Sequence, residues 1–139
     1  MPTNPHVLVV DDQPDFRESI ATLLATEGFR VSGASSGDEA LTMVEAASLD
    51  DQIDILLLDY RMPGRNGGQT LKEIRARGVP ARAILVSATP GIEVLRHRFG
   101  FDEALAKPCS FADLIAAIRR CIGNGLAGAT PMPSLPTAF

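Results

Sequence analysis

Short apolar runs alternate with segments of helical period along most of this 139-residue chain, and this alternation limits the folds open to it. Four runs rich in aliphatic and β-branched residues predict strands at 7–10, 30–34, 53–58 and 83–86. A weaker run, Glu103 to Ala106, predicts a fifth strand. Strands that alternate with helices pair in parallel through right-handed crossovers, so we expect an α/β sandwich with helices on both faces of one parallel sheet.

The segments between these runs carry the start and stop signals of helices. In the first segment, apolar residues recur every three or four positions, and Gly28 follows where a glycine would end a helix. Ser36 and Glu39 form a capping-box pattern at the start of the second. Three further helices are expected at 68–77, at 92–99, where the helix is short, and from Ser110 onward.

A single domain accounts for the part of the chain in which strand-like and helix-like segments alternate. The composition, 45% hydrophobic and 22% charged, is that of a compact domain that needs neither disulfides nor structural metal. We expect an N-terminal extension at 1–6, the domain at 7–122, and a flexible Gly/Pro-rich tail at 123–139 with no output domain. Two cysteines, Cys109 and Cys121, are too few for a disulfide framework and favour a reducing cytoplasm.

The charge balance and the first residues argue against several classes of partner. A formal net charge of −4 without basic clusters offers no electrostatic surface for nucleic acid. The N-terminus has no basic segment, and the first apolar run is too short for a signal peptide or a membrane span. The sequence therefore predicts a protein that binds neither nucleic acid nor membranes.

Charged and hydroxyl side chains directly follow four of the five expected strands. Ligands of open parallel sheets bind outside the carboxyl ends of the strands, so we expect these side chains to line one crevice. In strand order they are Asp11 and Asp12, then Asp59, Ser87 and Lys107.

Three carboxylates that converge in one crevice repel one another unless a cation neutralises them. Hard oxygen ligands favour Mg²⁺, with Mn²⁺ as a substitute, and Mg²⁺ takes one or two protein carboxylates together with phosphate oxygens. Lys107 beside such an ion would orient a phosphoryl group, which one of the aspartates would attack to form an acyl phosphate. Ser87 would then hydrogen-bond the phosphate and move the loop after its strand.

Four motifs stand at these strand ends: Val-Val-Asp11-Asp12, Leu-Leu-Leu-Asp59-Tyr-Arg-Met-Pro63-Gly, Leu-Val-Ser87-Ala88 and Ala-Lys107-Pro108. In this order, they resemble the motifs of a response regulator receiver domain, and the resemblance covers nearly all of residues 6–122. It implies a flavodoxin-like (βα)5 fold with a five-stranded parallel sheet in the order 2-1-3-4-5. It also implies a single-domain response regulator that signals through protein partners or a phosphorelay and is not a classical enzyme.

The resemblance implies that Asp59 accepts a phosphoryl group from a phosphohistidine on a sensor histidine kinase or a histidine phosphotransfer protein. Asp12 and Asp59 would ligate Mg²⁺ directly together with the backbone carbonyl of Arg61, and Asp11 would act mostly through water. The only reactions implied are self-phosphorylation from small donors and autodephosphorylation.

Other motif residues would hold and report the phosphoryl group. The resemblance implies that Lys107 pairs with it, that the backbone amide of Ala88 donates to it, and that Ser87 is the switch hydroxyl. The Lys107-Pro108 peptide is expected to be cis, which would aim the lysine into the crevice.

Two further positions are implied to tune hydrolysis of the phosphoryl group. Arg61 lies two residues after Asp59, and Thr89 lies two residues after Ser87. A long cation at position 61 would cover the phosphate and slow or redirect hydrolysis.

The sequence departs from the family pattern before the lysine. Receiver domains commonly carry Tyr or Phe three residues before it, and here that position is Ala104. The interval between Ser87 and the lysine is short, and Pro90 and Gly91 stand where the fourth helix would begin. We therefore expect a rearranged output face, formed by the fourth helix, the fifth strand and the fifth helix, which is also the face through which a homodimer would form.

Three other functions are alternatives. A pseudo-receiver would signal by phosphate-independent protein binding, and Ala104 is compatible with it. A Mg²⁺-dependent aspartyl-phosphate phosphatase would need a second carboxylate two residues after Asp59, where this chain has Arg61. A flavodoxin-like flavin carrier would need a phosphate loop where this chain has Asp11 and Asp12, which repel phosphate.

The remaining noticeable residues fit structural roles. The segment 64–68 matches no phosphate-binding motif and is expected to be a flexible loop. Cys109 and Cys121 are expected to be half-buried or buried structural thiols. His6 and His97 stand away from the strand ends of the site and are expected at the surface.

Overall fold

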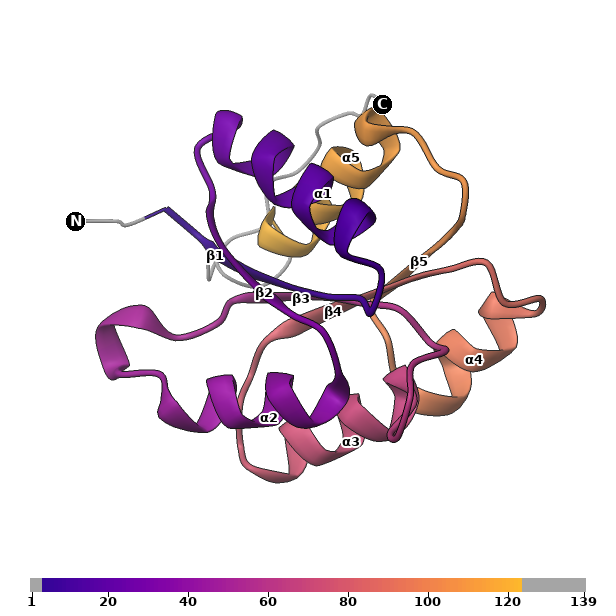
Figure 1. The fold of residues 1–139 in the computed structure, drawn as a ribbon, viewed down its shortest axis with the longest axis horizontal. Helices are drawn as coiled ribbons and strands as arrows, with labels where there is room; N and C mark the ends of the chain where they lie inside the picture. The colour runs from indigo at the N-terminus through magenta and orange to yellow at the C-terminus, as the bar shows by residue number, and fades with distance from the viewer. Residues whose placement is uncertain (1–3, 124–139) are drawn as a thin grey trace.

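Five parallel strands and five α-helices form an α/β sandwich in the computed structural model, which describes residues 4–123 (Figure 1). The sheet order is β2-β1-β3-β4-β5, as expected. Most of the tail expected at 123–139 lies outside the described residues, as do residues 1–3. The strands are β1 (His6–Val10), β2 (Arg30–Ala34), β3 (Ile55–Leu58), β4 (Arg82–Ser87) and β5 (Glu103–Ala106). The helices are α1 (Pro14–Thr26), α2 (Gly37–Ala46), the 3₁₀ turn η1 (Leu49–Asp51), α3 (Gly67–Ala76), α4 (Ile92–Phe99) and α5 (Phe111–Cys121).

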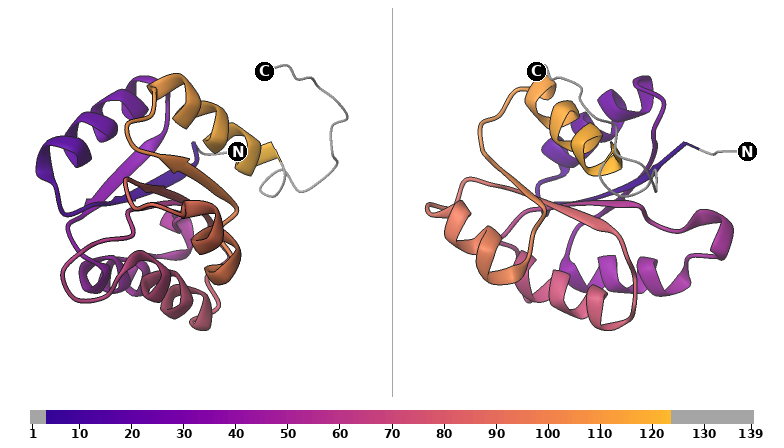
Figure 2. Two further views of the ribbon diagram at one scale, coloured as in Figure 1. Left: turned by 90° about the vertical axis from the view of Figure 1, so that its right-hand side faces the viewer. Right: turned by 180° about the vertical axis from the view of Figure 1, so that it is seen from behind.

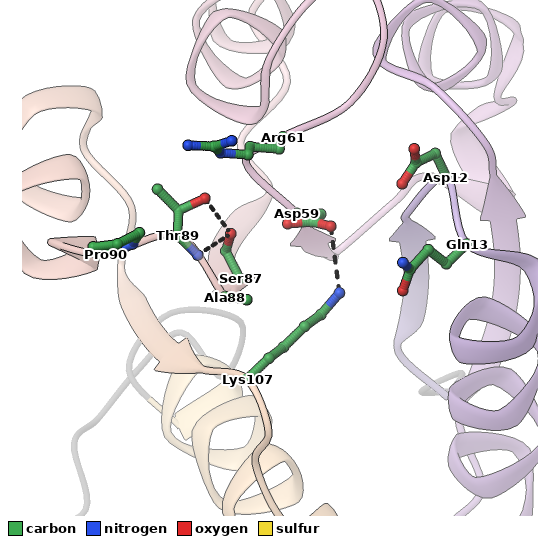
Figure 3. Close-up of a pocket in the computed structure, with 9 residues that line it drawn as sticks. All are labelled: Asp12, Gln13, Asp59, Arg61, Ser87, Ala88, Thr89, Pro90 and Lys107. Atoms are coloured by element: carbon green, nitrogen blue, oxygen red, sulfur yellow. Dashed lines mark hydrogen bonds and ion pairs between the residues drawn. The ribbon is translucent and has the colours of Figure 1, made fainter.

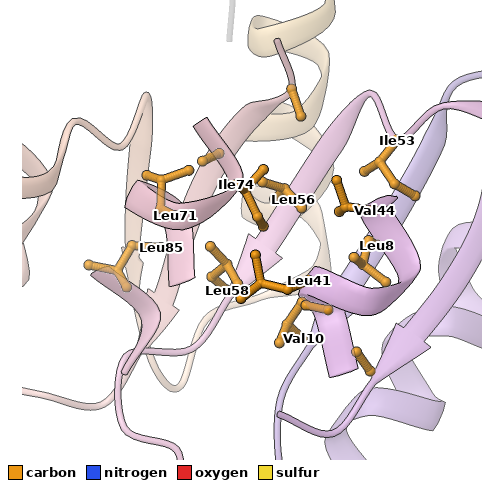
Figure 4. Close-up of a cluster of buried hydrophobic side chains, with 14 of the residues drawn as sticks. Leu8, Val10, Leu41, Val44, Ile53, Leu56, Leu58, Leu71, Ile74 and Leu85 are labelled. Atoms are coloured by element: carbon orange, nitrogen blue, oxygen red, sulfur yellow. The ribbon is translucent and has the colours of Figure 1, made fainter. Parts of the chain in front are cut away.

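The helices lie on both faces of the sheet, and each face has its own apolar core. Helices α1 and α5 cover one face, and α2, α3 and α4 cover the other (Figures 1 and 2). Alternate residues of β3 enter opposite cores: Leu56 and Leu58 pack towards α2 and α3 (Figure 4), whereas Ile55 and Leu57 pack towards α1 and α5. A strand covered on both faces has no polar side, which explains the uninterrupted apolar run.

The expected strand at 53–58 pairs over a shorter range, because β3 begins at Ile55. Ile53 lies outside the strand but is buried, so its apolar side chain indicated burial and not strand pairing. Asp54 intervenes, and its carboxylate accepts a hydrogen bond from the backbone N–H of His6 at 2.9 Å. Strand β4 is longer than expected, at Arg82–Ser87, because its polar end residues also pair.

The expectation that His6 lies at the surface is wrong. Its side chain is buried at the start of β1, where Nε2 lies 2.7 Å from Ser32 Oγ and Nδ1 lies 3.2 Å from the backbone oxygen of Asp51. These partners come from β2 and η1, which the sequence places 26 and 45 residues away. His97 is exposed on α4, as expected.

The segment 64–68 was expected to be a flexible loop, and its last two residues instead begin α3. The side chain of Asn66 accepts from the N–H of Gln69 at 2.8 Å, and Gln69 bonds back to the N–H of Asn66, which completes a capping box. A Cβ at Gly67 would lie 2.2 Å from the backbone oxygen of Asp59, and one at Gly68 would lie 2.5 Å from the ring of Phe99. These glycines therefore allow close packing and do not serve flexibility.

Helix α4 is short, as expected: it spans eight residues, none of them fully buried. Gly91 at its N-cap has a φ of 75°, a left-handed conformation that glycine adopts without strain. Within residues 4–123, no helix combines the length and the hydropathy that a membrane crossing requires.

Both cysteines are free thiols that pack as structural residues. Cys121 is buried in the core under α5, and Cys109 is half-buried. Burial raises the pKa of the Cys121 thiol to about 12, and burial together with the charge of Asp113 raises the pKa of Cys109. Neither thiol is therefore an activated nucleophile at neutral pH.

Gly68→Ala tests the packing at the start of α3. An alanine inside a helix ordinarily stabilises the helix by about 1 kcal/mol relative to a glycine at the same position. Here the added methyl group would meet the Phe99 ring, so we expect a net loss of about 1–3 kcal/mol in urea unfolding. The same change in a Phe99→Ala background should cost far less, and equal costs in both backgrounds would show that the ring is not the obstacle.

Candidate functional site

A pocket of about 510 Å³ opens at the carboxyl ends of the strands, where the sequence places the candidate residues (Figure 3). The loops that follow β1, β3, β4 and β5 all contribute to its wall. Its lining residues are Asp12, Gln13, Asp59, Arg61, Ser87, Ala88, Thr89, Pro90 and Lys107.

Three carboxylates meet beside this pocket, as expected from their places after β1 and β3. One oxygen each from Asp11, Asp12 and Asp59 lies within 4.8 Å of the others. Asp11 is buried, Asp59 is partly buried and Asp12 is exposed. Carboxylate oxygens at this spacing suit a hard divalent cation, and the exposure of Asp12 leaves a path to solvent.

Local hydrogen bonds fix the orientation of Asp11. Its Oδ1 accepts from the backbone N–H of Gln13 at 2.9 Å, and its own N–H donates to the carbonyl of Ala34 at 3.1 Å. The guanidinium of Arg17 on α1 donates to the carbonyl of Asp11 at 2.6 Å. The turn between β1 and α1 therefore holds the buried carboxylate towards the centre of the site.

Lys107 reaches this cluster from the end of β5. Its Nζ donates to Asp11 Oδ2 at 2.7 Å and to Asp59 Oδ2 at 3.3 Å. The Lys107-Pro108 peptide is cis, as expected. Nζ also lies 4.1 Å from the centre of the Phe16 ring, a cation–π contact.

The two aspartates raise the pKa of Lys107. Burial by itself favours the neutral amine, but the hydrogen bond to Asp11 and the charges of Asp59 and Asp11 outweigh burial. The pKa of Lys107 consequently lies above the ordinary lysine value. The lysine is therefore a fixed positive charge at neutral pH and does not act as a general base.

The backbone around Asp59 is held at several points. The N–H of Asp59 donates to the carbonyl of Val10 at 3.1 Å, and the N–H of Tyr60 donates to Asp59 Oδ1 at 2.7 Å. The other carboxylate oxygen faces Lys107 (Figure 3). Asp59 is thus oriented by one main-chain donor and one cation, with the pocket beside it.

The hydroxyl of Ser87 faces Thr89 and not Asp59 (Figure 3). It donates to Thr89 Oγ1 at 3.0 Å and accepts from the N–H of Thr89 at 3.2 Å. Ala88, between them, lines the pocket. Ser87 is therefore paired away from the carboxylates in this conformation.

Arg61 lies across the pocket from Lys107 with an exposed side chain. Within the part of the chain that the structure describes, its guanidinium has no hydrogen-bond or ion-pair partner. Ala104 lies outside this group: it pairs with Leu85 in the sheet and packs, half-buried, against the core beneath α4.

The sequence did not point to three residues that shape the site. Gln13 lines the pocket, and its backbone N–H donates to the Asp11 carboxylate. The ring of Phe16 makes the cation–π contact with Lys107, and the backbone N–H of Tyr60 donates to the Asp59 carboxylate. Phe16 was assigned only to the apolar face of a helix, which is also correct. Gln13 and Tyr60 adjoin the predicted aspartates, and this adjacency was the only signal available.

Comparisons of the sequence with known proteins show one family. A sequence-family model described as response regulator receiver domain matches residues 7–119. The transcriptional regulatory protein CpxR of Escherichia coli K12 is 38% identical over 114 residues, which cover 81% of this chain and 47% of that protein. The sensory transduction protein RegX3 of Mycobacterium tuberculosis is 33% identical over 86% of this chain and 51% of its own. The chain thus spans about half the length of the curated relatives it matches.

Solved structures show the same fold. A CheY-like receiver domain protein from Methanospirillum hungatei superposes with a TM-score of 0.82 and 22% identity, over 91% of this chain and all of that one. The response regulator TrrA of Thermotoga maritima, solved in complex with Mg²⁺ and BeF, has a TM-score of 0.73 and 29% identity. That match covers 84% of this chain and 98% of TrrA.

The raised pKa of Lys107 predicts an alkaline loss of stability. The folded state holds this proton more tightly than the unfolded state does, so the stabilisation is complete below the ordinary lysine pKa of 10.5 and is lost as pH rises through the folded value. In urea unfolding without divalent cations, Lys107→Met should lose less stability between neutral and strongly alkaline pH than the wild type. Lys72→Met, at an exposed position, serves as the control. Equal alkaline losses in wild type and Lys107→Met would contradict the prediction.

Proposed function

This chain belongs to the response regulator receiver domains, the signalling domains of two-component systems, and we propose that it accepts a phosphoryl group on Asp59 from a phosphohistidine donor. The donor would be a sensor histidine kinase or a histidine phosphotransfer protein. Signalling would follow through contact with a further protein or through transfer of the phosphoryl group along a relay. The cytoplasm is the compartment in which such donors would meet it.

The convergence of Lys107 with the carboxylates of Asp11 and Asp59 is the observation that carries this proposal. A phosphoryl acceptor needs a nucleophilic oxygen with fixed positive charge next to it, because charge builds up on the equatorial oxygens of the transferring group. Asp59 has such a charge at 3.3 Å, and the adjoining pocket has room for a phosphoryl group.

The donor set fits a divalent cation, Mg²⁺ or Mn²⁺. Three carboxylate oxygens lie within 4.8 Å of one another, with a single ammonium among them to balance their charge. Asp12, Asp59 and the backbone carbonyl of Arg61 would hold the ion directly, and Asp11 would hold it through water. When bound, the cation would neutralise charge on the phosphoryl oxygens.

In the proposed transfer, an oxygen of Asp59 attacks phosphorus in line with the histidine nitrogen. The O–P bond forms as the N–P bond breaks, and the electron pair stays on the ring nitrogen. A phosphohistidine protonated on its other ring nitrogen leaves as neutral imidazole, so Asp59 handles no proton. Lys107 keeps its own proton and holds the phosphoryl oxygens with it.

We infer that the residues at the end of β4 and directly after it respond to the new group. Ser87 and the amide of Ala88 adjoin the pocket, and Ser87 is held by Thr89 until a stronger acceptor is present. A dianionic phosphoryl group is such an acceptor, since hydrogen bonds to charged groups are roughly twice as strong as neutral ones. We therefore assign Ser87 the role of the switch hydroxyl.

A phosphate-independent receiver is the second candidate, and Ala104 is the observation that favours it. The side chain that commonly reports phosphorylation is missing there, whereas the acidic pocket is complete. The aspartyl-phosphate phosphatase is disfavoured, because Arg61 lies where the second carboxylate would be needed.

Incubation with acetyl phosphate and Mg²⁺ tests the leading proposal. We expect the wild type to gain the mass of one phosphoryl group, located on Asp59 by peptide mass spectrometry. Asp59→Asn should gain none, and chelation of divalent cations should prevent the gain. Asp50→Asn, the same change at an exposed aspartate of η1 outside the pocket, serves as the control and should gain the phosphoryl group like the wild type. A wild-type protein that gains no phosphoryl group would support the phosphate-independent receiver instead.

Arg61 is expected to lengthen the lifetime of the phosphoryl group. Its guanidinium is unpaired within residues 4–123 and lines the pocket, where it would cover the phosphoryl oxygens. An exposed ion pair is worth up to about 1 kcal/mol, so Arg61→Met should shorten the lifetime by roughly 2- to 5-fold. The measurement follows loss of the label after the donor is removed, and an unchanged or longer lifetime would refute this role.

A further inference from the structure

Helix α4 lies at the surface of the domain. None of its residues is fully buried, and the side chain of Val94 is 67% exposed. Three half-buried side chains, Ile92, Leu95 and Phe99, pack against the core on the α2–α4 side of the sheet. These three side chains make the apolar contacts of α4 with the core, and each can be substituted separately from the other two.

Phe99 packs against the start of α3. Its ring lies directly against the backbone of Gly68 at the start of α3, where a Cβ would come within 2.5 Å of it. The ring also meets that of Tyr60, with the ring centres 6.1 Å apart and the planes tilted by 47°. The last turn of α4 is thus packed against the loop that follows β3.

Tyr60 is itself tied to the phosphoacceptor and to α3. Its N–H donates to Asp59 Oδ1 at 2.7 Å, and its carbonyl accepts from the N–H of Gly67 at 2.8 Å. Its hydroxyl accepts from the side-chain amide of Asn66 at 3.2 Å. A change at the Asp59 carboxylate therefore reaches the Tyr60 backbone through one hydrogen bond.

We propose that the Tyr60–Phe99 contact transmits phosphorylation of Asp59 to α4, in place of the aromatic side chain that is absent at Ala104. The proposal rests on the phosphoacceptor function. Forming the acyl phosphate removes the negative charge from the carboxylate, so the bond from the Tyr60 N–H loses its charge assistance and about half its strength. The Tyr60 backbone then shifts, and the Tyr60 ring takes a new position against the ring of Phe99. Because Phe99 belongs to α4, the helix moves with it.

This route differs from one that runs through the hydroxyl of Ser87. Ser87 acts on the segment before α4, whereas Phe99 is the last residue of that helix. Packed interfaces switch between discrete arrangements, so a contact at the end of a short helix is enough to reposition it. The two routes can be separated, because the Phe99 ring packs on Gly68 and Tyr60, and neither of these residues lines the pocket.

Amide hydrogen exchange with and without beryllofluoride and Mg²⁺ tests the proposal. In the wild type, the phosphoryl mimic should change the exchange rate of residues 91–100 by about 2- to 10-fold, the range expected for an aromatic pair. In Phe99→Leu this change should be lost, and in Phe99→Tyr, which keeps a ring, it should return. Leu95→Ala loosens α4 elsewhere and should keep the wild-type response.

A separate readout distinguishes failure of this proposal from failure of the phosphoacceptor function. The chain has one tyrosine and no tryptophan, so the fluorescence of Tyr60 beside Asp59 reports binding of the mimic in the wild type and in Phe99→Leu. In Phe99→Tyr, which has two tyrosines, slower amide exchange at residues 11–13 and 59–61 reports binding instead. A wild type that does not bind beryllofluoride would overturn the phosphoacceptor function and this proposal together. Binding with an unchanged α4 response in Phe99→Leu, or equal loss in Leu95→Ala, would overturn this proposal alone. If Phe99→Leu does not fold, Tyr60→Leu replaces it as the variant that removes the aromatic pair. Because Tyr60→Leu has no tyrosine, binding of the mimic is then followed by amide exchange at the other residues of the site.

Discussion

The Lys107 ammonium between the carboxylates of Asp11 and Asp59 is the interaction on which the site depends. It joins the ends of β5, β1 and β3, whose residues lie 96 and 48 positions apart in the chain. Three carboxylates placed together would repel, and the lysine balances part of that charge before any other cation is present. The parallel sheet is what brings these strand ends to one edge, so the fold and the electrostatics of the site are inseparable.

The same arrangement supports the proposal that the site takes up a phosphoryl group. The buried Asp11 is held by the N–H of Gln13 and by Lys107, and the lysine is supported in turn by the face of Phe16. With these groups already oriented, little reorganisation is needed when a charged ligand enters. Asp12 and Arg61, by contrast, are exposed, which leaves the mouth of the pocket open to solvent and to a partner.

Close packing on the far side of Asp59 gives the domain a second distinctive feature. Gly67 and Gly68 let α3 approach the Asp59 carbonyl and the Phe99 ring more closely than any side chain would allow. The loop after β3, the start of α3 and the end of α4 are therefore packed as one unit. This packing places the Tyr60–Phe99 aromatic pair close to Asp59, the proposed phosphoacceptor, in a chain that has Ala104 three residues before the lysine.

Local patterns in the sequence were sufficient to predict the alternation of strands and helices, the strand order through the family resemblance, and the set of polar residues at the strand ends. They sufficed because periodicity, caps and strand-terminal positions are properties of neighbouring residues. Only the tertiary structure decided that His6 is buried between β2 and η1, that Phe16 supports the lysine, that Ser87 faces Thr89 and that Phe99 rests on Gly68. Apart from the Ser87–Thr89 pair, these contacts join residues far apart in the chain, and side-chain direction and close approach depend on how whole elements pack, which no local pattern encodes.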